Sequence, residues 1–108
     1  MASAVVVTPA SGSITHLVTA VNITATGAVP NTATGYDTTA YPSEPALNRY
    51  FKCALAGQPT LLSPHFNSNA AGAAEWNSVL FPAAGSWTVT LNFVSDDSVD
   101  ATATVVVA

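Results

Sequence analysis

The sequence has very little charge. Asp, Glu, Lys and Arg make up 7% of its 108 residues, and Arg49 and Lys52 are the only fixed cations in a chain of formal net charge -4. Two cations cannot neutralise a run of phosphates, so we expect neither a nucleic-acid partner nor a membrane partner. Free small domains usually carry about 25% charged residues. The low share of charged residues favours a protein that works packed against neighbouring proteins. An ordinary β-sandwich domain whose surface is covered by Ser, Thr and Asn would have the same composition.

Cysteine occurs once, which excludes a disulfide within the chain. Cys53 is in phase with Leu47, Phe51 and Leu55, and this alternation predicts a small buried hydrophobe rather than a nucleophile. The opening residues MASAVVVTPASG lack the basic start and the apolar core of a signal peptide, and no segment reaches the length of a membrane span. We therefore expect synthesis and assembly in the cytosol, although a domain cut from a larger exported protein would read the same way.

Strong helix formers are also scarce. Glu, Lys, Arg and Gln are almost absent, whereas Ala, Val, Thr and Ser dominate, and this composition predicts an all-β protein. A chain of 108 residues is long enough for one core and too short for two. Residues 1–108 are therefore expected to form a single domain, with long loops at 27–46 and 57–74.

Regular alternation is clearest in the last quarter of the chain. From Trp87 to Phe93 every second residue is apolar and the residues between them are polar, as in a half-buried strand. An acidic turn follows, and the alternation then resumes until Val107. The side chains expected to face the core are Trp87, Val89, Leu91 and Phe93, then Val99, Ala101, Ala103, Val105 and Val107. The two segments are typical of the closing hairpin of a β-sandwich.

Five further strands are expected, giving about seven in all. They cover residues 3–8, 16–26, 47–55, 60–63 and 75–81, of which 60–63 is a short edge strand. In 16–26 the inward face is expected to hold Leu17, Thr19, Val21, Ile23 and Ala25. In 47–55, Arg49 interrupts the inward face and is expected near the strand end, where its guanidinium reaches water.

The segment 84–91, AGSWTVTL, together with the acidic turn and the Ala/Thr/Val strand at 100–107, resembles the end of bacterial and phage immunoglobulin-like domains, including the polycystic-kidney-type and bacterial-Ig families. In those families a Gly, a small residue and an aromatic residue open the penultimate strand. With further similarity near 5–9 and 18–27, the resemblance covers the first and last quarters of the chain. It implies an immunoglobulin-like β-sandwich of about seven antiparallel strands, most like a virion accessory protein of a tailed phage.

The chain departs from the antibody type of this fold. The cysteine pair between the sheets is missing, and Ile23 and Leu91 are expected to fill that part of the core. Trp87 takes the corner where a tyrosine often lies. Its indole N–H therefore needs an acceptor, which we expect to be a carbonyl of the preceding loop.

The sequence holds no pattern of catalytic or metal-binding residues. Asp96, Asp97 and Asp100 carry oxygen ligands suited to calcium, but their spacing is not that of a loop cage, and a solvated hairpin turn is expected. His16 and His65 have no Cys or acidic partner at zinc spacing. There is no nucleophile elbow and no phosphate-binding Gly-rich loop. We therefore expect no catalytic residue, no metal, no cofactor and no enzyme activity.

A specific function is expected to reside in the long loops. The candidate partner-binding residues are Tyr36, Tyr41, Leu61, Leu62, His65 and Phe66. Tyrosine buries contact area at little entropic cost, and the other four residues form an apolar patch between prolines. Each group has an alternative role, since the tyrosines would cover the open end of the sandwich and the patch would complete the core. Trp76 is expected in the core.

Immunoglobulin-like sandwiches serve as adhesins, carbohydrate-binding modules, enzyme spacers and virion proteins, so the fold alone does not decide the function. We expect a non-enzymatic structural protein of a bacteriophage virion that decorates or cements the capsid, or forms part of a head or tail appendage. Its partners would be the major capsid protein or other virion subunits, in a homo-oligomer or a lattice, after assembly in the host cytoplasm. The alternative is a module of a bacterial surface protein that binds carbohydrate or a receptor, with Trp76 or Tyr41 as the stacking platform.

Overall fold

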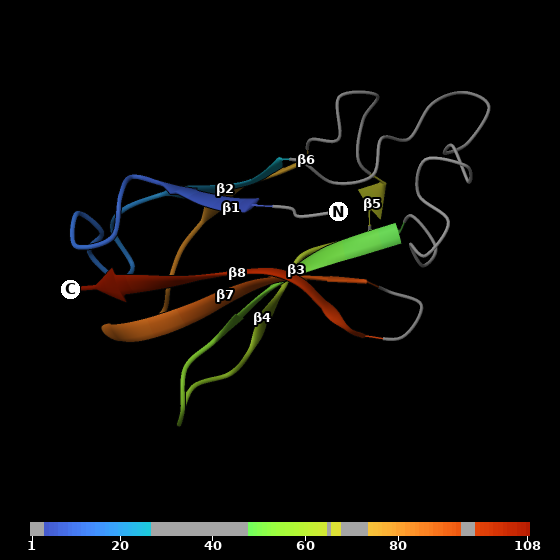
Figure 1. Ribbon diagram of the computed structural model, residues 1–108. Coiled ribbons are helices and arrows are strands. Elements are labelled where there is room, and N and C mark those ends of the chain that lie inside the picture. The colour runs from blue at the N-terminus through green and yellow to red at the C-terminus, as the bar shows by residue number, and fades with distance from the viewer. Residues whose placement is uncertain (1–3, 27–47, 65, 68–73, 94–96) are drawn as a thin grey trace, which may run out of the picture.

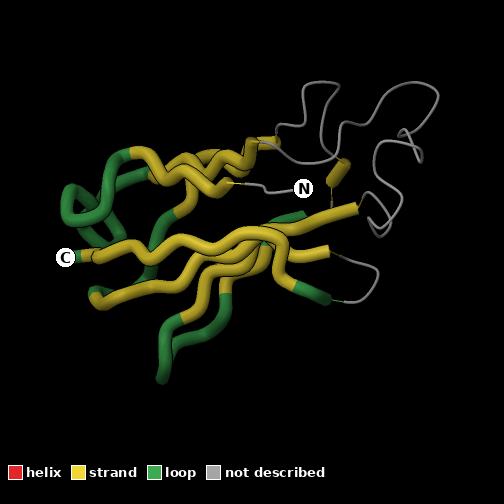
Figure 2. Tube along the Cα trace, viewed as in Figure 1, coloured by secondary structure: helices red, strands yellow, loops and turns green. Residues whose placement is uncertain are grey.

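The computed structural model describes residues 4–26, 48–64, 66–67, 74–93 and 97–108. Within these ranges the chain has strands and turns but no helix, and the strands form two antiparallel sheets packed face to face (Figures 1 and 2). The strands are β1 (Ala4–Thr8), β2 (Val21–Thr26), β3 (Asn48–Ala54), β4 (Leu61–Leu62), β5 (Phe66–Asn67), β6 (Ala74–Val79), β7 (Gly85–Phe93) and β8 (Val99–Val107). The predicted all-β sandwich is confirmed.

The order of the strands is that of an immunoglobulin-like sandwich. One sheet has the order β1-β2-β6, and the other has the order β4-β3-β7-β8, with β5 also paired to β3. In an immunoglobulin domain the first, second and fifth strands likewise share one sheet, and the third, sixth and seventh share the other. Since β7 lies between β3 and β8, its inward side chains stand at the middle of the core.

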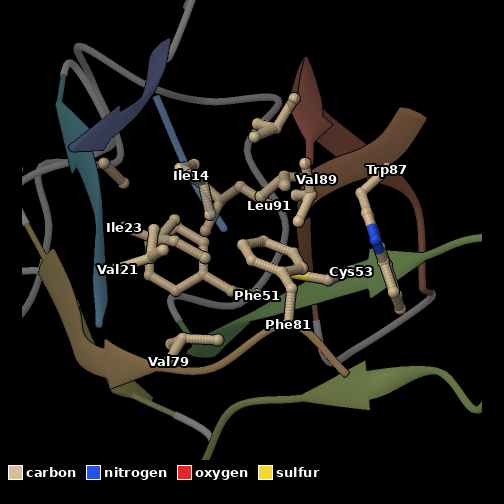
Figure 3. Close-up of a cluster of buried hydrophobic side chains, with 13 residues drawn as sticks. Ile14, Val21, Ile23, Phe51, Cys53, Val79, Phe81, Trp87, Val89 and Leu91 are labelled. Carbon is tan, nitrogen blue, oxygen red and sulfur yellow. The ribbon is translucent and has the colours of Figure 1, made fainter. Parts of the chain in front are cut away.

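Alternating side chains of β2, β3 and β7 fill the space between the sheets (Figure 3). Trp87, Val89 and Leu91 are fully buried, and Phe93 is nearly so, as the alternation predicts. Ile23 and Leu91 both lie in the core, which agrees with their expected place in a domain without a cysteine pair. Non-polar side chains, rather than a covalent link, therefore hold the two sheets together.

Trp87 is tied to the loop before its own strand. Its Nε1–H donates to the Ala83 carbonyl at 2.9 Å, which confirms the expected kind of acceptor, and its ring centre lies 5.2 Å from that of Phe81. Gly85 has φ +147°, and a Cβ at this position would lie 2.8 Å from the Leu55 side chain. The Gly-Ser-Trp start of β7 therefore combines an anchored aromatic ring with a glycine at a positive φ, where an added Cβ would have to displace the Leu55 side chain.

The segment between β1 and β2 crosses from one sheet to the other. β1 ends before Pro9, and Ile14 then forms a parallel bridge with Val107 of β8. Ile14 is 1% exposed, so the crossing brings an additional side chain into the core. We call residues 9–16 the crossing segment. It joins the two sheets at the end of the sandwich that carries Ala108 (Figure 1).

The expectation for 16–26 is wrong in its first half. β2 begins only at Val21, and residues 16–18 form a turn in which Leu17 has φ 61° and is 63% exposed. Hydrogen bonds hold this turn, since Leu17 N–H donates to the Phe81 carbonyl at 2.9 Å and Thr19 N–H donates to the Thr15 carbonyl at 3.0 Å. Leu17 and Thr19 therefore leave the predicted inward face, which is buried only from Val21 onward.

Arg49 lies near the start of β3, as expected, but it is buried, so the prediction that its guanidinium reaches water is wrong. The residue is 1% exposed. Its Nε lies 3.3 Å from Asp100 Oδ2, and its Cζ lies 4.4 Å from the centre of the Phe93 ring. The guanidinium is therefore accommodated inside the sandwich by a carboxylate and an aromatic face.

A β-bulge in β8 brings Asp100 to Arg49. Leu91 faces Ala101 across the hairpin, but the next residue, Asn92, faces Val99, so Asp100 is an extra residue in its strand. A bulge redirects side chains relative to strict alternation. The Asp100 side chain is consequently only 7% exposed. Val99, which the alternation places in the core, is 56% exposed, so that prediction is wrong.

The shorter strands agree with expectation in position. β4 lies inside the expected edge strand 60–63, and most of β6 lies inside 75–81. β5 is an addition, since it falls in the stretch expected to be the loop 57–74. The expected loop 27–46 lies outside the described residues.

Candidate interaction surface

β4 forms one edge of the second sheet and carries two of the predicted contact residues. Ser63, the next residue, anchors it to β3. Ser63 N–H donates to the Phe51 carbonyl at 3.0 Å, and Phe51 N–H donates to Ser63 Oγ at 2.8 Å. Because Ser63 is itself buried, these bonds are shielded from water and hold the edge strand in one position.

The two leucines of β4 face opposite ways. Leu61 pairs with Cys53 and packs against the buried cluster, which is the core-completing role. Leu62 pairs with Lys52 and is 59% exposed. Of the two predicted contact residues, Leu62 is therefore the one available to a partner.

Of the six predicted contact residues, only Leu61 and Leu62 have side chains that the structure describes. Tyr36, Tyr41 and His65 lie outside the described residues, and for Phe66 only the backbone of β5 is described. β5 pairs with β3 at Arg49, whereas β4 pairs with it at Lys52 and Cys53. The backbones of Leu62 and Phe66 thus lie three residues apart along β3.

Three exposed apolar side chains lie on neighbouring segments at the end of the sandwich that carries Ala108. Leu17 is 63% exposed, Val18 is 76% exposed and Leu80 is 47% exposed. The hydrogen bond from Leu17 N–H to the carbonyl of Phe81 places the turn beside the residue that follows Leu80. We call Leu17, Val18 and Leu80 the end patch. Sequence reasoning missed it, although two consecutive apolar residues at 17 and 18 break strict alternation.

The end patch lies in an uncharged part of the molecule. Residues 9–20, 79–87 and 101–107 contain no Asp, Glu, Lys or Arg. The buried pair of Arg49 and Asp100 lies near the other end of β7 and β8, beside the hairpin turn. A partner that covers the end patch therefore has no charged side chain of these segments to desolvate.

Two aspartates considered as calcium ligands have other partners. The Tyr50 hydroxyl donates to Asp97 Oδ1, and Asp100 is paired with Arg49. Asp96 lies outside the described residues. Across the described ranges, no three His, Cys, Asp or Glu side chains are grouped so that they could hold a metal ion.

Cys53 is fully buried, and burial raises the pKa of its thiol from 9.0 to about 12. We expect the folded chain to resist thiol-specific reagents at neutral pH, because the reactive species is the thiolate. Since the folded pKa lies above the unfolded one, the contribution of this thiol to stability is fully present below pH 9.0. It is lost as the pH rises from 9.0 towards 12, because the unfolded thiol ionises in this range while the folded one stays neutral.

Mass spectrometry after timed labelling checks this expectation, with the chain unfolded in denaturant as the control. The unfolded chain should be labelled completely, whereas the folded chain should be labelled only as fast as it opens. Labelling of the folded chain at the rate of a free thiol would contradict the buried position of Cys53.

No helix in the described part of the chain is long and apolar enough to cross a membrane. Comparison with known proteins gives no match: no family model matches the chain, and neither a curated protein nor a solved structure is significantly similar to it.

Proposed function

We propose that this chain is a non-enzymatic structural protein of a bacteriophage virion, which decorates or cements the capsid or forms part of a head or tail appendage. The observation that carries the proposal is the end patch, where Leu17, Val18 and Leu80 are exposed in an uncharged region. Exposed apolar side chains gathered in one place are typical of a protein interface. On a particle, one weak contact is multiplied by the symmetry of the shell.

The position of Leu62 adds support. It stands on an edge strand, whereas the end patch stands at one end of the sandwich. A single chain thus exposes apolar side chains at two separate places, which suits a protein that bridges neighbouring shell subunits. The resemblance of the first and last quarters of the sequence to phage immunoglobulin-like domains points the same way.

Co-sedimentation with purified particles tests the proposal. The particles come from the phage whose genome encodes the chain, with this gene deleted, and the purified chain is added back. We expect wild-type chain to sediment with the particles and Val18→Asp to bind about tenfold more weakly or worse, because the new carboxylate must be desolvated at the contact.

Val99→Asp is the matched control, since Val99 is also an exposed valine but lies beside the hairpin turn instead of at the end patch. It should bind as wild type does. The proposal fails if the wild-type chain stays in the supernatant, or if Val18→Asp and Val99→Asp bind equally well.

The alternative, a carbohydrate-binding module of a bacterial surface protein, needs an aromatic platform. Trp76 is stacked with Phe51 inside the sandwich, with ring centres 6.4 Å apart and an angle of 9° between the planes. One face of its ring is therefore already occupied. Tyr41 lies outside the described residues, so no described side chain specifically favours this function.

A further inference from the structure

β8 ends the second sheet, so among the described residues one of its sides has no hydrogen-bonded strand, although β1 of the other sheet lies close to it. The crossing segment covers the last part of that side. Gly12 N–H donates to the Val106 carbonyl at 2.9 Å, and Ala108 N–H donates to the Ile14 carbonyl at 2.8 Å. Backbone N–H and C=O groups alternate in direction along a strand. At this end of β8, the even-numbered residues therefore direct these groups away from β7.

Thr102 and Thr104 continue the same alternation. Ala103, which lies between them, directs its backbone groups to β7, where it faces Val89. In the described part of the chain, no hydrogen bond reaches the outward N–H and C=O groups of Thr102 or Thr104. These four groups are a template for another strand.

The usual protections of an open edge are missing from this stretch. Sheets commonly guard their edges with lysine, proline, bulges or very short strands. β4 is two residues long between Pro59 and Pro64, and β6 contains a bulge. In contrast, residues 101–107 contain neither lysine nor proline. The bulge of β8 is at Asp100, whose carboxylate turns inward.

We propose that two copies of this chain pair antiparallel through Ala101–Val105 of β8, so that the second sheet continues across a two-fold axis. The stretch is bounded by the bulge at Asp100 and by the covered residue Val106. Its midpoint is Ala103. Pairing along its full length therefore places Ala103 of each copy opposite the other.

This register pairs each Thr102 with Thr104 of the second copy. Both residues direct N–H and C=O outward, so each of the two pairs exchanges two N–H···O hydrogen bonds. Threonines directly opposite one another are a favourable cross-strand pair. The two Ala103 residues form a non-hydrogen-bonded pair at the two-fold axis. Side chains lie closer together in such a pair, so a small side chain is suitable there.

We infer a second copy as the partner because two copies of this stretch, placed antiparallel, match each other in length and register and bring no charged side chains together. Each chain has a net charge of -4, yet no charged side chain lies within residues 101–107. Two copies therefore meet at this edge without direct like-charge repulsion. A two-fold pair is closed, so the association stops at two chains. This inference does not depend on binding to a particle.

Sedimentation equilibrium of the purified chain tests the pairing. The mass should rise from 10.9 kDa towards twice that value as the concentration approaches about 1 mM. Thr104→Pro removes an outward N–H that has no partner among the described residues of the single chain, so it should keep the fold and lose the dimer. Thr104→Val keeps the N–H and the branched shape, and it should dimerise as wild type does.

Amide hydrogen exchange of the wild-type chain gives a second readout that needs no variant. The amides of Thr102 and Thr104 should become protected as concentration rises, whereas that of Val6 in β1, an edge strand of the other sheet, should not change. A chain that stays at 10.9 kDa, a Thr104→Pro variant that still dimerises, or concentration-dependent protection of β1 alone would each overturn the proposal.

Discussion

Replacing Trp87 with alanine is expected to lower the free energy of unfolding by about 3–5 kcal/mol. Trp87 is the largest fully buried side chain among the described residues. The change removes its ring from contact with Phe81 and its Nε1–H from the Ala83 carbonyl. Domains are usually stable by only about 5–15 kcal/mol. The variant should therefore be close to the limit of folding at room temperature.

Urea denaturation followed by far-ultraviolet circular dichroism measures the loss. Trp87→Phe is the conservative variant: it keeps most of the ring packing but leaves the Ala83 carbonyl without its donor, so about 1–3 kcal/mol should be lost. Val18→Ala serves as the surface control and should change stability by less than about 0.5 kcal/mol, because Val18 is 76% exposed. Equal losses for Trp87→Ala and Val18→Ala would contradict the proposed packing.

The closing hairpin was predictable because apolar residues recur at every second position along both of its strands. One register shift would expose every inward side chain of β7 at once, so the burial of Trp87, Val89 and Leu91 follows from the pattern alone. The indole partner was predictable for a related reason. A buried N–H needs an acceptor, and the loop just before the strand is the nearest source of carbonyls.

The errors in the fold come from contacts between distant parts of the sequence. The pattern at 16–26 is compatible with one long strand, but the bond from Leu17 N–H to the Phe81 carbonyl makes its start a turn. No local signal contains that partner. Similarly, nothing in the alternation of Val99–Val107 marks Asp100 as the extra residue of a bulge. In the structure this bulge places Val99 at the surface.

The candidate interaction surface was only partly predictable. Leu62 was predicted as part of an apolar patch between prolines, with burial in the core as the alternative, and the structure leaves it 59% exposed. The end patch was missed, since Leu17 was assigned to the core and Leu80 belonged to an apolar run whose phase the sequence does not define. Arg49 did carry a signal. An arginine in phase with Phe51 and Cys53 must either leave the core or find an anion there, and the structure places Asp100 beside it.

Asp100→Ala is expected to lower the free energy of unfolding by about 3–5 kcal/mol, because it leaves the buried charge of Arg49 without its carboxylate. The two side chains are 1% and 7% exposed, so solvent screens their interaction weakly and the loss should change little with salt. Lys52→Ala is the control on the same strand. Lys52 is partly exposed, and its removal should cost less than about 1 kcal/mol.

A double-mutant cycle separates the ion pair from other effects of removing Asp100. In the background Arg49→Met, no buried cation remains, so the further change Asp100→Leu should cost little or even stabilise the fold. The coupling energy between the two positions should then reach about 2–3 kcal/mol. Equal costs of Asp100→Leu with and without Arg49 would show that the carboxylate acts through the bulge geometry rather than through the guanidinium. A large coupling would mean that the ion pair itself stabilises the fold, and that the bulge contributes by turning the Asp100 carboxylate towards Arg49.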